Sequence, residues 1–167
     1  MGCAEQGGSH TILVVDSSGS MRKDDVPGYR SRTAAVYHTI AKDFCRPQIQ
    51  ERHAGGQEHL VTLVEMGVEA EVKFERQPID ERLVARLERR ADSYARSHGN
   101  YIPALDKVLE LLKKDKNNLK QLFVIFLSDG APSDHAVRTC DHGVEVWQHV
   151  DYFPDNPLQN CGWGARC

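Results

Sequence analysis

A short apolar run, Ile12–Val15, leads directly into the polar segment Asp16-Ser17-Ser18-Gly19-Ser20. A β-branched apolar run closed by an acid and a Gly/Ser cluster is typical of a buried strand that ends in a tight loop. The loop offers a carboxylate at Asp16 and hydroxyls at Ser18 and Ser20, at positions i, i+2 and i+4. Small oxygen-only side chains suit a hard cation such as Mg²⁺. We therefore predict a strand over about residues 11–16 with a candidate cation site at its carboxyl end.

A second apolar run ends in the same way. Residues 121–127 carry the sequence Gln-Leu-Phe-Val-Ile-Phe-Leu, and Ser128-Asp129-Gly130-Ala131-Pro132 follows. This run predicts a strand buried on both faces, again with an acid just beyond its carboxyl end. Two strands that each deliver an acid, Asp16 and Asp129, form a pattern expected of a binding site.

These two segments resemble the motifs of the von Willebrand factor type A (vWA) domain. Asp-x-Ser-x-Ser followed by Met21, and the distal run Phe123–Pro132 that contains Ser-Asp-Gly, are similar to the family's metal-ion-dependent adhesion site (MIDAS). The resemblance covers residues 10–135 in order and spacing. It implies a protein-interaction domain that binds a divalent cation, and a strand order of 3-2-1-4 that places the first and fourth strands side by side.

The resemblance also implies a ligand set. Ser18 and Ser20 would coordinate the metal directly, and Asp16 and Asp129 would complete or orient its shell. The cation would be Mg²⁺ or Mn²⁺, with Ca²⁺ as an alternative. An open coordination position would accept an Asp or Glu side chain from a protein partner.

The chain departs from the family pattern at one ligand position. Members of the family usually supply a threonine just before the helix that contains Pro103, and the corresponding residue here is Gly99. Either Asn100 or Ser97 would have to replace the missing oxygen, and an Asn amide oxygen suits a hard cation. Metal binding weaker than in the family is one expected consequence.

The remaining segments predict an α/β fold. Helices are expected over residues 31–45, ending before Pro47, over 80–91, and from Pro103 with a buried stripe of Ala104, Leu105, Val108, Leu109 and Leu112. Strands 59–66 and 69–75 form an antiparallel hairpin whose second member is an edge strand, with Ala70, Val72 and Phe74 on one face. This order indicates a Rossmann-like, open, mostly parallel sheet flanked by helices.

We expect three regions: a flexible leader over residues 1–9, a vWA-like domain over 10–135 and an irregular tail over 136–167. The tail shows no buried strand where the family has two further strand–helix units, so the domain is expected to be truncated. One alternative is that the tail covers the exposed edge of strand 121–127. A zinc site formed by tail residues is disfavoured by their irregular spacing; its candidate ligands are Cys140, His142, Cys161 and Cys167.

Composition excludes several functions. The chain has 167 residues and a net charge of −3, without the basic face of a nucleic-acid-binding protein. No run is long and apolar enough to span a membrane, and no secretory signal is evident. Five irregularly spaced cysteines indicate free thiols and an intracellular, cytoplasmic protein. Gln6 stands where a myristoylation motif requires Ser or Thr, so N-terminal lipidation is not expected.

The sequence thus favours a metal-dependent protein-interaction module over two alternatives. The first alternative is a vWA scaffold within a larger protein that does not use metal. The second is an enzyme of the haloacid-dehalogenase phosphotransferase type, which also places an aspartate after its first strand. That chemistry requires a second acid at the position of Ser18, and the chain has neither a P-loop nor a dinucleotide fingerprint. No catalytic residue is therefore assigned.

Overall fold

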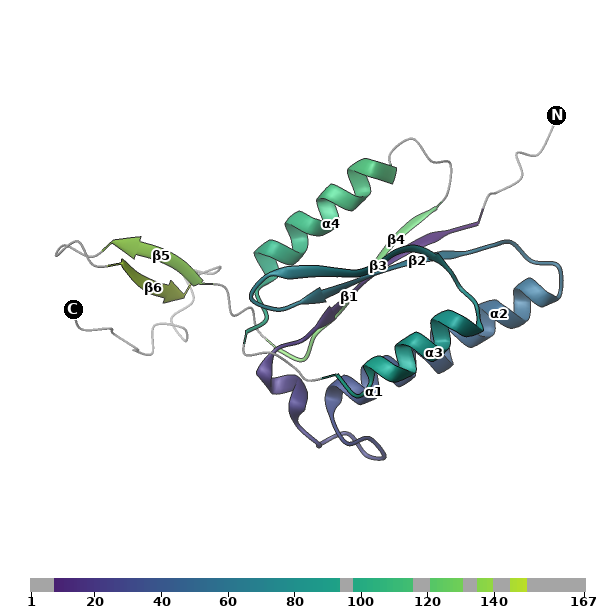
Figure 1. The fold of residues 1–167 in the computed structure, drawn as a ribbon, viewed down its shortest axis with the longest axis horizontal. Helices are drawn as coiled ribbons and strands as arrows, with labels where there is room; N and C mark the ends of the chain where they lie inside the picture. Colours follow the sequence, from purple (N-terminus) through teal and green to yellow (C-terminus); the bar gives the residue numbers. More distant parts are fainter. Residues whose placement is uncertain (1–7, 94–97, 116–120, 131–134, 140–144, 150–167) are drawn as a thin grey trace.

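The computed structural model describes residues 8–93, 98–115, 121–130, 135–139 and 145–149, the last two segments by their backbone only. Its main sheet has the order β3-β2-β1-β4 (Figure 1). The strands are β1 (His10–Asp16), β2 (Leu60–Met66), β3 (Ala70–Pro78) and β4 (Leu122–Leu127). β1 pairs in parallel with both β2 and β4, whereas β3 runs antiparallel to β2. The predicted open, mostly parallel sheet with an antiparallel edge strand is confirmed.

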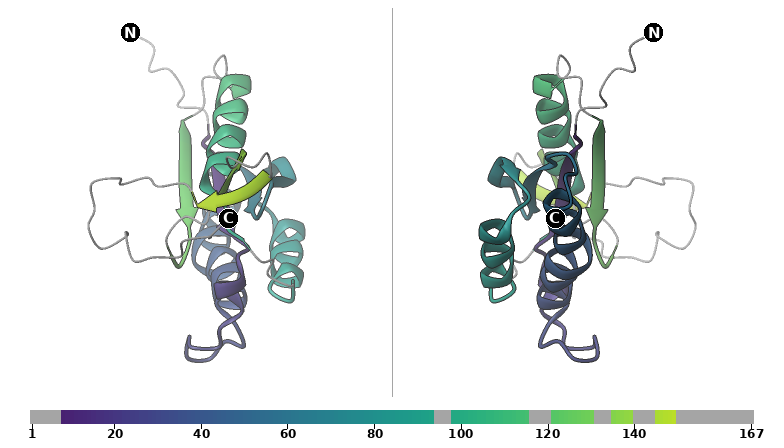
Figure 2. Two further views of the ribbon diagram at one scale, coloured as in Figure 1. Left: turned by 90° about the vertical axis from the view of Figure 1, so that its left-hand side faces the viewer. Right: turned by 90° about the vertical axis from the view of Figure 1, so that its right-hand side faces the viewer.

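Helices cover both faces of this sheet. α4 (Tyr101–Asp115) lies on one face, and α1 (Arg32–Thr39), α2 (Arg46–His53) and α3 (Glu81–Arg90) lie on the other (Figures 1 and 2). Alternate residues of β1 therefore belong to different cores: Leu13 and Val15 pack with α1–α3, and Ile12 and Val14 pack with α4. Because both faces are covered, β1 and β2 are buried along their whole length.

The helical segment after the first loop is longer than predicted. Ser31 caps α1 by accepting a 3.0 Å hydrogen bond from the Ala34 amide. A π-helical segment, η2 (Ile40–Cys45), joins α1 to α2, which begins at Arg46. The predicted end before Pro47 is wrong, because Pro47 occupies the first turn of α2, where its missing N–H needs no partner. The helical segment accordingly continues to His53.

β3 does not alternate as strictly as its sequence suggests. Ala70 and Val72 pack on the α4 face, but Phe74 packs into the core formed by α1–α3. The pairing register with β2 shifts between Val64 and Leu63, as in a β-bulge. The extra residue turns Phe74 to the opposite face, so the predicted shared face of these three side chains is wrong.

The buried stripe of α4 also differs from the prediction. Ala104, Val108 and Leu111 are buried, whereas Leu105 and Leu109 are 52% and 50% exposed. On the adjacent edge of the sheet, Phe123 and Val124 of β4 are 48% and 43% exposed, so β4 is not buried on both faces. β4 is an edge strand of the described sheet, which leaves Phe123 and Val124 exposed.

The predicted irregular tail contains two strands among its described residues. β5 (His135–Thr139) and β6 (Glu145–His149) pair antiparallel in a separate two-stranded sheet. Cys140, His142, Cys161 and Cys167, the candidate zinc ligands, lie outside the described residues, as do residues 1–7 of the predicted leader. The predicted domain boundaries and the truncation remain predictions.

Cys45 is a free thiol in the core below the sheet. Burial raises the pKa of Cys45 to about 12, since the thiolate would lose its hydration there. The thiol therefore stays protonated and inert while the domain is folded. Of the helices in the described part of the chain, none has the length and apolar character needed to cross a membrane.

Candidate metal centre

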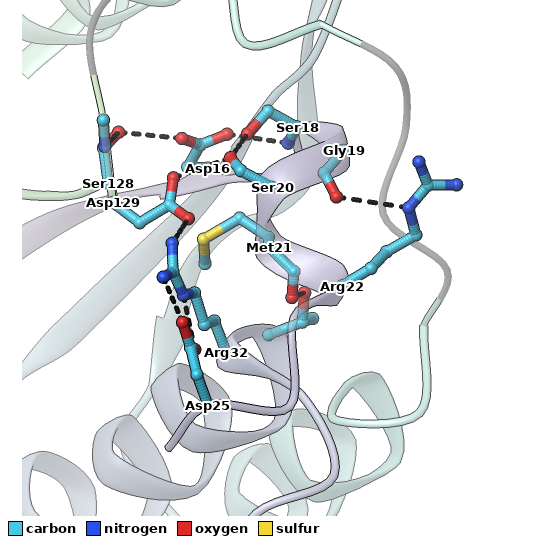
Figure 3. Close-up of polar contacts among 12 residues, drawn as sticks. Asp16, Ser18, Gly19, Ser20, Met21, Arg22, Asp25, Arg32, Ser128 and Asp129 are labelled. Carbon is cyan, nitrogen blue, oxygen red and sulfur yellow. Dashed lines mark hydrogen bonds and ion pairs between the residues drawn. The ribbon is translucent and has the colours of Figure 1, made fainter.

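The loop after β1, which follows Asp16, and the loop after β4, which carries Asp129, meet at the carboxyl ends of these two strands (Figure 3). β1 and β4 are adjacent and parallel, with Val15 opposite Leu127, so the segments that follow them leave the sheet at the same edge. Asp16 is the last residue of β1, and Asp129 lies two residues beyond β4. After Asp16, the chain turns into the short 3₁₀ helix η1 (Gly19–Arg22).

Asp16 is buried and held in place at both of its carboxylate oxygens. Its Oδ1 accepts a 2.7 Å hydrogen bond from the backbone N–H of Ser18. Its Oδ2 accepts a 2.7 Å hydrogen bond from the hydroxyl of Ser128. Only 4% of Asp16 is exposed, so its negative charge depends on these donors or on a bound cation for compensation.

The hydroxyls of the loop connect the first acid to the second. Ser18 Oγ and Ser20 Oγ are 2.9 Å apart, and the Ser20 hydroxyl donates a 2.8 Å hydrogen bond to Asp129 Oδ1. The structure thus brings together all four predicted ligands: Asp16, Ser18, Ser20 and Asp129 (Figure 3). The Ser18 amide joins Asp16 to this group, and the Ser18 and Ser20 hydroxyls join it to Asp129.

Arg32, which the sequence did not single out, supplies a cation to this cluster. Its guanidinium forms an ion pair with Asp129 from the side opposite Ser20 and a second ion pair with Asp25 (Figure 3). The Arg32 Nε donates to Asp25 Oδ1 at 2.7 Å. Asp25 and then Asp129 raise the pKa of Arg32, and Arg32 lowers the pKa of the Asp25 carboxyl. No local motif marks Arg32, because its contacts depend on how α1 meets the two loops.

Ser128 and Tyr101 are further members of the site that the prediction did not include. The Tyr101 hydroxyl lies 2.9 Å from Ser128 Oγ and 2.8 Å from the carbonyl oxygen of Gly130. Tyr101 therefore fixes the loop after β4 from the start of α4. The Ser-Asp-Gly motif could have indicated Ser128, whereas nothing near Tyr101 in the sequence indicates its contact.

Gly99 lies directly against two of the predicted ligands, Asp16 and Ser18. A Cβ at this position would lie 2.8 Å from Asp16 Oδ1 and 3.1 Å from Ser18 Cβ. The next residue, Asn100, donates from Nδ2 to the Val68 carbonyl at 3.1 Å. Its Oδ1 is buried and has no hydrogen-bond partner among the described residues. Ser97, the other candidate replacement, lies outside them.

We expect Gly99→Thr to lower the free energy of unfolding of the metal-free domain by about 1–3 kcal/mol, the usual cost of overpacking. The new Cβ would displace the Asp16 carboxylate and strain its hydrogen bond to the Ser18 amide. Urea denaturation monitored by circular dichroism measures the change. Gly28→Ala tests backbone strain without crowding, since Gly28 has a φ of +83° and open space around it. A Gly99→Thr domain as stable as the wild type would contradict the observed packing.

The donor set fits a hard divalent cation. It consists of two carboxylates and hydroxyl groups, without sulfur or imidazole. Asn100, the next residue after Gly99, has a buried side-chain oxygen without a hydrogen-bond partner among the described residues. In the described part of the chain, no cluster of three or more His, Cys, Asp or Glu residues offers an alternative metal site.

The chain matches the family model of the von Willebrand factor type A domain over residues 11–131. Since the match covers most of the chain, the protein belongs to the vWA domain family. A search of curated protein sequences found no match.

Solved structures with the same fold include proteins of different kinds. The SpRpn10 VWA domain is 12% identical, with a TM-score of 0.54, over 75% of this chain and 62% of that structure. The open form of the pilus adhesin SpaC from Lactobacillus rhamnosus GG is 16% identical, with a TM-score of 0.61, over 89% of this chain and 18% of that one. The PilB minor pilin from Streptococcus sanguinis is 17% identical, with a TM-score of 0.60, over 83% of this chain and 34% of that one. The chain thus spans less than two thirds of each structure, and identities this low establish the fold alone.

Proposed function

We propose that this domain is a protein-interaction module that binds a divalent cation, Mg²⁺ or Mn²⁺, at the carboxyl edge of its sheet. The observation that carries the proposal is the hydrogen-bonded chain in which the Ser18 amide holds Asp16 and the Ser18 and Ser20 hydroxyls lead to Asp129. In the proposed site, Ser18 and Ser20 bind the cation directly, and Asp16 and Asp129 complete or orient its shell. Asn100 is the proposed source of the oxygen that the family draws from threonine.

The bound cation would supply a positive charge that attracts a carboxylate of the partner. The protein's own residues prepare this interaction. Ser128 and the Ser18 amide fix the orientation of Asp16, and Arg32 fixes Asp129. Arg32 also neutralises part of the negative charge of Asp129, so the Asp or Glu side chain of a partner meets less repulsion at the site. The adhesin and pilin among the structural neighbours agree with an interaction role.

The structure also provides an argument for a scaffold that does not use metal. The guanidinium of Arg32 already forms an ion pair with Asp129, and Arg32 is held in this position by a second ion pair with Asp25. Such an ion pair stabilises Asp129 without a divalent cation, which leaves only Asp16 to be compensated. A phosphotransferase is less well supported, because Ser18, whose amide hydrogen-bonds to Asp16, stands where a second acid would be required.

Peptide binding in the presence and absence of metal tests the proposal. An array of peptides that each present one Asp or Glu, paired with the Asn or Gln version, is probed with the labelled domain in Mg²⁺ and in EDTA. We expect retention that requires both the metal and the carboxylate, and that is lost in Asp16→Asn. Asp24→Asn, a change at an exposed acid of the following loop, serves as the matched control and should bind as the wild type does. Equal retention of the domain on the peptides in Mg²⁺ and in EDTA would favour the scaffold that does not use metal.

A further inference from the structure

A second candidate binding site lies between β3 and α3. A groove of about 300 Å³ is lined by Lys73, Phe74, Arg86, Arg89, Arg90 and Ser93. Its lining therefore contains four cationic side chains, an aromatic ring and a hydroxyl, but no acid. Strand β3 is the edge of the sheet, so the groove lies on a side of the domain away from β4.

The fold separates charges that are interspersed in the sequence of α3. Glu81 and Glu88 alternate with the arginines along the helix, which by itself suggests a solvated surface of mixed charge. In the structure, both acids instead pair with Arg46 of α2, at 3.8 and 3.1 Å. The acids therefore face α2, and the groove retains its cationic character.

Part of this cationic lining is held by one buried acid. The side chain of Glu65 is 8% exposed; it accepts a 2.9 Å hydrogen bond from Arg90 Nε and lies 3.4 Å from Lys73 Nζ. Tyr37, also buried, donates its hydroxyl to Glu65 at 2.6 Å. These contacts, together with the ion pair between Lys73 and the half-exposed Glu71, neutralise the charge of Lys73 and Arg90 and restrict their motion. Side chains already ordered lose less conformational entropy when a ligand binds.

Arg86 and Arg89 provide the charge that is not neutralised. Arg86 stacks on the Phe74 ring, 4.7 Å from its centroid, and donates to Gln77 Oε1 at 3.3 Å. Arg89 donates to the carbonyl oxygen of Ala85 at 3.2 Å. Among the described residues, the contacts of both arginines are with neutral groups. Their remaining N–H groups can bind carboxylates with two hydrogen bonds.

We infer that this groove binds an acidic, Asp/Glu-rich segment of a protein partner. The short row of cations fits a few neighbouring carboxylates, whereas the net charge of −3 opposes a long polyanion such as nucleic acid. The inference is independent of the metal centre, because no groove residue belongs to it.

Fluorescence anisotropy with a short fluorescein-labelled Asp/Glu peptide tests the groove. We expect Arg89→Glu to weaken binding by about fivefold or more, because the change replaces an attraction with a repulsion. Arg82→Glu is the matched control, since it makes the same charge change on the same helix at a residue outside the groove. This control should retain most of the wild-type affinity, and circular dichroism confirms that both variants are folded.

Three results would overturn the inference. The first is the absence of peptide binding by the wild-type domain at low salt. The second is an equal loss of affinity in Arg89→Glu and Arg82→Glu, which would indicate general attraction to charge. The third is tighter binding of a single-stranded oligonucleotide than of the peptide at the same salt concentration. EDTA should have no effect on peptide binding, and this separates the groove from the metal centre.

Discussion

Replacing Glu65 with alanine is expected to lower the free energy of unfolding by about 3 kcal/mol, the lower end of the cost of breaking a buried ion pair. Glu65 is buried and is contacted by Arg90, Lys73 and the hydroxyl of Tyr37. Its removal leaves Arg90 and a buried hydroxyl without this acceptor, whereas Lys73 keeps its ion pair with Glu71. The partial exposure of Arg90 places the expected cost at the lower end of that range.

Urea denaturation of the wild type, Glu65→Ala and Glu71→Ala measures this effect. Glu71 also pairs with Lys73 but is half exposed, so its loss should cost less than about 1 kcal/mol. Comparable costs for the two substitutions would contradict the assigned role of Glu65. Since Glu65 also holds two cations of the groove, Glu65→Gln allows peptide binding to be examined without creating a cavity.

The second large effect concerns the metal centre. If the domain binds Mg²⁺ as proposed, a free Mg²⁺ concentration one hundred times the dissociation constant should raise the free energy of unfolding by about 2.7 kcal/mol. Asp16→Ala should abolish this increase. It should also destabilise the metal-free domain by about 1 kcal/mol or more, since the Ser18 amide and the Ser128 hydroxyl lose their acceptor.

Thermal and urea unfolding in Mg²⁺ and in EDTA provide the measurement. Asp24→Asn again serves as the control that should keep the full metal response. If Mg²⁺ still raises the free energy of unfolding of Asp16→Ala, the responsible ion binds elsewhere on the domain. Arg32→Gln distinguishes the two proposed functions further. If Arg32 substitutes for metal, its loss should destabilise the metal-free domain and strengthen the response to Mg²⁺.

The sequence alone predicted the strands and the approach of Asp16 and Asp129 because both depend on local signals. The apolar run Ile12–Val15 can only be buried, and the Asp and Ser residues that follow must then lie at the end of that strand. The order of the strands came from the resemblance to the vWA family, and the observed sheet confirms it. Gly99 was assigned to the family's threonine position by counting from the helix, and in the structure it lies against Asp16.

The features that were missed depend on contacts between distant segments. Arg32 is separated from Asp129 by most of the chain, and only the docking of α1 brings them together. A bulge reversed the face of Phe74, and a π-helical segment carried the helix past Pro47. In each case, tertiary packing overrode a correct local pattern. The same packing separated the acids of α3 from its arginines and so revealed the groove.

Calorimetric titration of Mn²⁺ into the purified, metal-free domain tests the central claim most directly. The proposed site predicts one bound ion per chain in the wild type and in Asp24→Asn, and no binding in Asp16→Asn or Asp129→Asn, with all four proteins folded. Absence of Mn²⁺ binding by the wild type, or equal binding by all four proteins, would contradict the assignment of a metal site to Asp16, Ser18, Ser20 and Asp129.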